Sequence, residues 1–177
     1  AFSQAFVPVL AEYKAQGSAA AVKELVNRVS GVLGGTLLFV TGISILAAPL
    51  VTTIFAPGFI SHPEKFYLTT EMIRITFPYL FLISMTGFCG AILNSFGRFA
   101  VPAFTPFFLN LSLIFAALIA APWFAEPVFA LAWGVLLAGV VQLLFQLPSL
   151  YRLDLVPRPI WDTSDEGVRR IADATLA

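Results

Sequence analysis

The sequence holds few side chains that could act on a substrate or bind a metal ion. Its 177 residues include one histidine, His62, and one cysteine, Cys89. A single imidazole and a single thiol form neither a zinc site nor an internal disulfide. The apolar stretches contain no glycine-rich phosphate loop, no Ser-His-Asp set and no paired carboxylates. We therefore predict no enzyme, metal site, cofactor or nucleic-acid partner.

The remaining candidates are polar side chains within or beside apolar stretches. Such residues tend to face a bundle interior or a water-filled cavity. Ser3 and Asn110 are uncharged, and a hydrogen bond between helices is the simpler interpretation of each. Arg74 lies about one helical turn inside an apolar stretch. Its guanidinium either reaches back to the membrane surface or attracts an anion into a cavity.

Composition indicates the solvent that these residues face. Of all residues, 59% are hydrophobic and only 11% are charged, and the formal net charge is zero. The mean hydropathy is +0.89. Soluble domains carry about 25% charged residues. This chain has too few charges to cover the surface of a water-soluble fold, so we expect it to lie in a membrane.

Four stretches are long and apolar enough to cross a bilayer, which takes about 20 residues as a helix. They cover residues 29–55, 73–96, 104–124 and 128–150, and residues 1–13 form a fifth, partial helix. Their apolar runs are continuous rather than alternating, which disfavours a barrel. Because only helices or closed barrels satisfy their own backbone in hydrocarbon, we predict an all-α transmembrane helix bundle.

Basic residues set the predicted orientation, because cytoplasmic loops carry more Lys and Arg. Placing residues 14–28, 97–103 and 151–177 in the cytoplasm puts eight of the ten there: Lys14, Lys23, Arg28, Arg98, Arg152, Arg158, Arg169 and Arg170. Residues 56–72 then form a periplasmic loop. The tail, 151–177, predicts an amphipathic linker helix capped by Thr163 or Ser164. We expect that helix to lie on the membrane, with Trp161 at the interface.

Glycines and prolines within the spans suggest how the helices pack and bend. Gly31, Gly34, Gly35 and Gly42 predict a face on which a neighbouring helix approaches closely. Proline inside a helix removes a hydrogen bond and introduces a kink, as in the bent helices of transporters. Pro78 and Pro148 are therefore the hinge candidates.

Several stretches together resemble the MurJ (MviN) family of lipid II flippases. They are AFSQAFVPVLAEYK, FAPGF, ITFPYLFLIS, GAILNSFGRFAVPAFTPFFLNLS and PVFALAWGVLLAGVVQLLFQLPSLYRL. The resemblance covers nearly the whole chain. It departs at the final IADATLA, where an apolar run toward the next span is expected. The family belongs to the MATE-like superfamily, which also holds drug exporters and polysaccharide flippases.

The resemblance implies a fragment of a larger transporter with two lobes. The chain would span the second to sixth helices of the N-terminal lobe and the linker toward the seventh, within the bacterial cytoplasmic (inner) membrane. The family moves lipid II, an undecaprenyl-diphosphate-linked muropeptide, to the outer leaflet by alternating access. The arginines thought to hold its pyrophosphate lie outside this chain.

What remains here is one wall of the substrate cavity, and Phe2, Ser3, Arg74 and Asn110 are its candidate lining residues. The expected partners are lipid II, membrane lipids and the remainder of the same chain. A shift of the linker would accompany the rocking of the two lobes.

Two other functions stay open at this point. The first is export of a polysaccharide-lipid or a drug by a member of the same superfamily, although AFVPVLAEYK and NSFGRFAVPAF favour the flippase. The second is a membrane scaffold that keeps the fold but transports nothing. Cavity arginines in the segment before residue 1 would favour the flippase over the scaffold.

Overall fold

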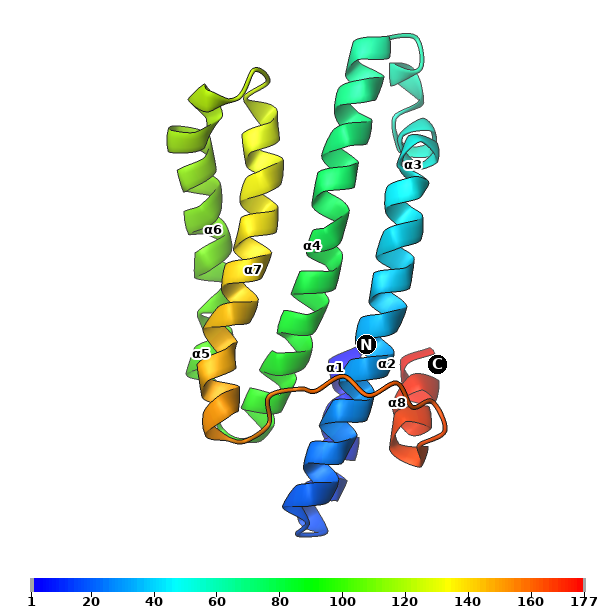
Figure 1. The fold of residues 1–177 in the computed structure, drawn as a ribbon, viewed down its shortest axis with the longest axis vertical. Helices are drawn as coiled ribbons and strands as arrows, with labels where there is room; N and C mark the ends of the chain where they lie inside the picture. The colour runs from blue at the N-terminus through cyan, green and yellow to red at the C-terminus, as the bar shows by residue number, and fades with distance from the viewer. Residues whose placement is uncertain (1, 177) are drawn as a thin grey trace. The chain divides into compact units, whose positions relative to one another are not determined.

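The computed structural model describes residues 2–176, and this range contains helices and connections but no strand (Figure 1). The longer helices are α1 (Phe2–Ala15), α2 (Ala19–Leu46), α4 (Pro63–Ser95) and α7 (Val128–Arg152). The shorter ones are α3 (Ala48–Phe55), α5 (Ala100–Ala103), α6 (Thr105–Phe115) and α8 (Glu166–Leu176). One-turn helices η1 (Pro57–Phe59), η2 (Ala116–Ala120) and η3 (Ala121–Trp123) complete the set.

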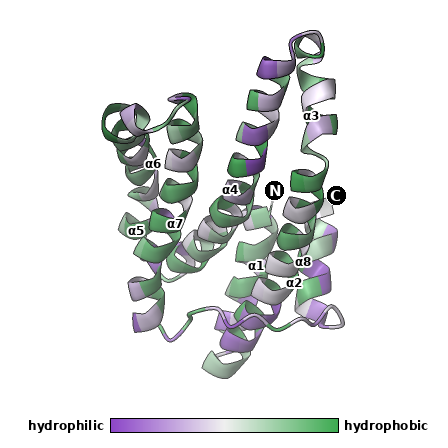
Figure 2. Cartoon of the chain, turned by 45° about the horizontal axis from the view of Figure 1, so that its top comes forward, coloured by the Kyte–Doolittle hydropathy of each residue, from purple (hydrophilic) through white to green (hydrophobic). Residues whose placement is uncertain are grey.

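Four helical segments of the described chain are long and apolar enough to cross a membrane. They are Ala19–Leu46, Pro63–Ser95, Ala100–Trp123 and Val128–Arg152. Figure 2 shows hydrophobic residues predominating along α7, whereas hydrophilic residues appear at the start of α2, at the start of α4 and on α8. The predicted fold class, an all-α transmembrane bundle, is confirmed.

The helices extend further into the connections than the predicted ranges. Residues 14–28 and 56–72 were predicted as loops, but α2 begins at Ala19 and α4 begins at Pro63. The start of α2 is capped, because the Ser18 hydroxyl accepts a hydrogen bond from the amide of Ala21 at 3.2 Å. Proline is well suited to the first position of α4, where no N–H donor is needed. The apolar windows therefore located the apolar part of each helix but not the residues at which the helix begins and ends.

Two predicted spans are interrupted rather than continuous. The first, 29–55, divides at Ala47 into α2 and α3, because Pro49 has no N–H to donate to the carbonyl of Ile45. The third, 104–124, changes from α-helix in α6 to a π-turn in η2 and a 3₁₀ turn in η3. Such changes of helix type re-satisfy the backbone where a regular helix cannot continue.

The chain divides into two compact units, and the three longest helices contribute to both. The linker unit comprises Ala1–Thr36, Ser84–Thr105 and Leu143–Ala177. The apolar unit comprises Leu37–Ile83 and Pro106–Gln142.

The linker unit contains a core of large apolar side chains. Phe6, Leu10, Val26, Phe88 and Ile92 are fully buried in it. The buried residues of α1 recur one turn apart along a single face of the helix: Ala5, Phe6, Val9 and Leu10. The rings of Phe6 and Phe88 pack with their centroids 5.0 Å apart. This core fixes α1 against α2, α4 and the end of α7.

The apolar unit is packed through small residues. A Cβ added at Gly139 would lie 2.8 Å from the ring of Tyr79 and 2.9 Å from Leu82. One added at Gly134 would lie 2.6 Å from the Cβ of Ala116. Helices in lipid approach closely where small residues face each other. Glycine therefore sets the spacing of α7 from α4 and from the α6–η2 segment.

Candidate functional site

Phe2 and Ser3, the cavity candidates on α1, occupy different environments. The ring of Phe2 stacks on Phe6 at 5.8 Å and lies 6.1 Å from the ring of Phe88. It also borders an apolar hollow of about 210 Å³ between α1, α2 and α8. Ser3 is exposed within the described chain. Phe2 is thus an edge of the core, whereas Ser3 is available to a neighbour or to solvent.

Arg74 and Asn110 belong to the apolar unit and make local contacts. The guanidinium of Arg74 pairs with Glu71, one turn earlier on α4. Asn110 is exposed, and its amide donates a hydrogen bond to the carbonyl of Pro106 at 3.2 Å. The sequence reasoning missed Glu71, whose carboxylate is the counter-ion of the Arg74 guanidinium. The cavity role of both residues stays a prediction.

The hinge candidates lie inside helices that continue past them. Pro78 is in the interior of α4, and Pro148 lies one turn before the end of α7. Neither proline interrupts its helix in this conformation. Bending at these positions stays a prediction.

The structure reveals a site that the sequence reasoning missed, where the linker after α7 crosses α2. Asn27 of α2 holds the linker at two points. Its side-chain oxygen accepts a hydrogen bond from the amide of Arg158 at 2.8 Å. Its backbone carbonyl accepts one from the amide of Ile160 at 3.1 Å. An extended segment of the linker is therefore fixed to α2 by its own backbone.

Gly31 and Gly35 let the linker approach the α2 backbone. Added Cβ atoms would lie 2.1 Å from the carbonyl oxygen of Ile160 and 2.0 Å from the ring of Trp161. The glycine face predicted to receive a helix therefore receives the linker instead. Asn27, Gly31 and Gly35 are spaced four residues apart, so they share one face of α2. That spacing was the available signal, but it did not identify the partner.

Arg28, the next residue on α2, gathers three carboxylates. Its guanidinium pairs with Glu24 on the same helix and with Asp165 at the start of α8. Its Nε lies 3.5 Å from an oxygen of Asp162 in the linker. Arginine suits such a position because its five donors are fixed in a planar fork. Arg28 thus ties the end of the linker to α2 by charge.

The helix α8 docks on α1 and α2. Its buried residues Val168 and Ile171 join the core of the linker unit, and Arg170 makes a two-point ion pair with Glu12 of α1 at 2.7 and 3.0 Å. The predicted amphipathic helix is present, but its apolar face is turned to protein. This face packs on α1 and α2. The position of the helix on the membrane, with Trp161 at the interface, stays a prediction.

The cap of α8 also differs from the prediction. Asp165, rather than Thr163 or Ser164, accepts a hydrogen bond from the amide of Val168, at 3.1 Å. Asp162 instead closes the preceding turn, accepting hydrogen bonds from the hydroxyl and the amide of Ser164. These bonds, the hydroxyl first, and the charge of Arg28 lower the pKa of Asp162. We name the contacts of Asn27, Arg28, Gly31 and Gly35 with residues 158–165 the linker clamp.

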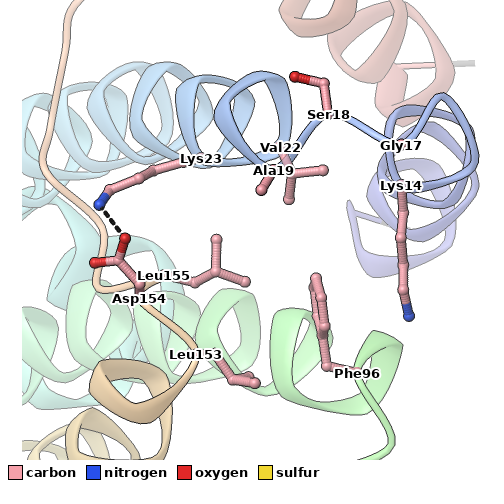
Figure 3. Close-up of a pocket in the computed structure, with 10 residues that line it drawn as sticks. All are labelled: Lys14, Gly17, Ser18, Ala19, Val22, Lys23, Phe96, Leu153, Asp154 and Leu155. Carbon is pink, nitrogen blue, oxygen red and sulfur yellow. Dashed lines mark hydrogen bonds and ion pairs between the residues drawn. The ribbon is translucent and has the colours of Figure 1, made fainter.

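A second feature of the linker unit is a hollow of about 290 Å³ at the meeting of helix ends (Figure 3). Figure 3 shows Phe96 and Leu155 pointing into it, with Lys14 and Lys23 at its sides. Lys14 donates to the carbonyl of Ser95 at 3.0 Å, and its ammonium lies 4.4 Å from the ring centroid of Phe96. Lys23 pairs with Asp154 at 2.7 Å. Both lysines therefore stabilise contacts between segments of this chain.

Asp154 takes a backbone conformation usually left to glycine. Its φ is 55°, and it follows α7 at the position where a left-handed residue ends the helix. The amide of Leu155 reaches back to the carbonyl of Leu150 at 3.0 Å, which closes this turn. The hydrogen bond from Lys23, followed by its charge, lowers the pKa of Asp154. Asp154 thus both turns the chain out of α7 and fastens it to α2.

Comparison with known proteins identifies the family. The family model described as "Lipid II flippase MurJ" matches residues 1–177. A probable lipid II flippase MurJ of Vibrio cholerae is 44% identical over 178 residues, covering 97% of this chain and 34% of the relative. A lipid II flippase MurJ of Burkholderia cenocepacia is 42% identical over 175 residues, covering 97% and 34%.

A third relative gives the same result. The probable lipid II flippase MurJ of Buchnera aphidicola subsp. Acyrthosiphon pisum is 41% identical over 170 residues, covering 96% of this chain and 33% of the relative. The chain thus spans about a third of the length of these relatives. It belongs to the lipid II flippase MurJ family and is part of a multi-pass protein of the bacterial inner membrane.

Proposed function

We propose that the full-length protein containing this chain moves lipid II from the inner to the outer leaflet of the cytoplasmic membrane. The observation that carries the proposal is the family match over all 177 residues, with relatives named as lipid II flippases. The protein acts in transport, and we assign no catalytic step to it. None of these relatives favours a drug exporter or a scaffold.

The physical task is to carry a diphosphate through hydrocarbon. Burying an unpaired charge costs far more than a protein fold can supply, so the diphosphate needs a hydrated, cationic path. In this chain the long helices α2, α4 and α7 are apolar enough to face lipid on the outside of such a path. We propose that Ser3, Arg74 and Asn110 line it, together with the edge of Phe2. The main anion-binding groups would come from the rest of the protein.

Alternating access requires that packed helices tilt without losing their hydrogen bonds. We propose that Pro78 and Pro148 are the points at which α4 and α7 bend, since a proline leaves one backbone carbonyl without its helical donor. The break before Pro49 between α2 and α3 offers a third such point. A bend at these places costs less than one in a regular helix.

Depletion of the full-length protein tests the proposal in cells that have no substitute flippase. Lipid II should accumulate in the inner leaflet, and re-expression of the protein should restore its transport. Continued outward transport of lipid II at the normal rate after depletion would contradict the proposal. Accumulation of a different lipid-linked sugar would instead support the polysaccharide-lipid exporter.

A further inference from the structure

The linker clamp fastens residues 158–165 to α2 through backbone, side-chain and ionic contacts at once. Two amides of the linker donate to Asn27, and two carboxylates of the segment meet Arg28. Asn27 is 9% exposed, so its oxygen is largely withheld from water. A buried acceptor that loses its donor costs more than the hydrogen bond is worth when made. Release of the linker would therefore leave polar groups unsatisfied.

The helix α8 extends this attachment to α1. Arg170 grips Glu12 through two hydrogen bonds, and a Cβ at Gly167 would lie 2.8 Å from Leu25 and 2.9 Å from the hydroxyl of Tyr13. Val168 and Ile171 are buried in the same core as Phe6 and Leu10. The attachment thus continues from residue 158 to Ile171 of α8.

We propose that the linker, α8, α1 and the start of α2 move as one body during transport, with Asn27 and Arg28 as the positioning residues. The inference rests on the proposed function for the movement, and on the geometry for the body that moves. A displacement of the chain that follows α8 is then transmitted to the start of α2 and to α1, which carries the cavity candidates Phe2 and Ser3. The linker thus moves together with α1 and α2 instead of moving independently of them.

The first test joins α1 to α8 covalently in the full-length protein. Glu12→Cys and Arg170→Cys are combined in a background in which Cys89 and any other cysteines are replaced, and the two thiols are linked by a short, reducible bifunctional reagent. Each single-cysteine variant, treated with the same reagent, is the matched control. The readout is the transport of lipid II before linking, after linking and after reduction.

The linked protein should transport at the same rate as its reduced form, because the joined parts never separate in the cycle. Loss of transport on linking, with recovery on reduction, would overturn the proposal, since it would mean that α8 must leave α1. A full-length protein that moves no lipid II in any state would count against the proposed function. The linker clamp is then judged by the second test alone.

The second test needs no transport. Asn27→Ala removes the oxygen that accepts the Arg158 amide, whereas Asn27→Asp keeps an acceptor in the same place. Amide hydrogen exchange in the linker should quicken about tenfold in Asn27→Ala and change little in Asn27→Asp. Equal exchange in the wild-type protein and both variants would show that the linker is not held by Asn27, and would overturn the proposal.

Discussion

The two units of the chain bury apolar side chains of different sizes. The linker unit encloses phenylalanine, leucine, isoleucine and valine, as a water-soluble domain would. In the apolar unit, the buried hydrophobic residues within the described range are all alanines: Ala48, Ala116, Ala130, Ala132 and Ala138. Many of its large apolar side chains, Leu46 and Leu118 among them, are exposed. The difference indicates that the apolar unit was selected for lipid as its solvent.

Polar contacts follow the same division. In the linker unit, ion pairs join residues far apart in sequence, such as Glu12 with Arg170 and Lys23 with Asp154. In the apolar unit, the Thr52 and Thr70 hydroxyls meet at 2.9 Å, and the Arg74 ion pair is local. Charged groups are costly in hydrocarbon, so ion pairs between distant residues are expected only where a unit is in contact with water. The linker clamp is possible for this reason.

The largest effect should come from emptying the core of the linker unit. Phe6→Ala removes a fully buried ring and should lower the free energy of unfolding by about 3–5 kcal/mol. Leu118→Ala in the apolar unit, where the side chain is 73% exposed, should change it little. Thermal unfolding of the full-length protein in detergent measures both. Equal losses would mean that the two units do not differ in where they bury large residues.

A smaller effect is expected from crowding the glycine contacts. Gly31→Ala places a methyl group against the Ile160 carbonyl, and Gly139→Ala places one against Tyr79 and Leu82. Each should cost about 1–3 kcal/mol, because a packed contact must open. Gly42→Ala is the control, since its added Cβ would meet nothing within 4 Å of the described chain. If Gly42→Ala lowered the free energy of unfolding as much as Gly31→Ala, the close approach of the linker would not be the cause of the loss.

How far the sequence predicted this structure depends on the range of the interaction. The spans were predicted because hydropathy over a window reports the local solvent, and the family resemblance supplied the function. The linker clamp was not predicted, because Asn27 and Arg158 are 131 residues apart and no local pattern connects them. The glycines of α2 were recognised as a close-contact face, but spacing alone could not distinguish a helix from an extended segment. The cap at Asp165 lies one residue beyond the predicted one.

The smallest effect should come from the exposed pair of Lys23 and Asp154. Asp154→Asn keeps a residue that tolerates the left-handed turn but removes the charge, so the unfolding temperature should fall only slightly. Because its folded pKa is lowered, the carboxylate stabilises the fold above its unfolded pKa of about 4, and this is lost as pH falls through the folded value. Thermal unfolding should therefore show the same small difference at pH 6 and pH 8. A difference that grows between these values would identify another titrating group.

These observations together predict that the apolar unit faces lipid and that residues 97–103 face the cytoplasm. The most direct test places nitroxide labels at Ile114 and, separately, at Phe99, which are 56% and 64% exposed. In the full-length protein in vesicles, oxygen should relax the Ile114 label and a water-soluble nickel complex should not. The Phe99 label should be reduced by ascorbate only in inside-out vesicles. A nickel-accessible Ile114, or a Phe99 label reduced in right-side-out vesicles, would contradict the account.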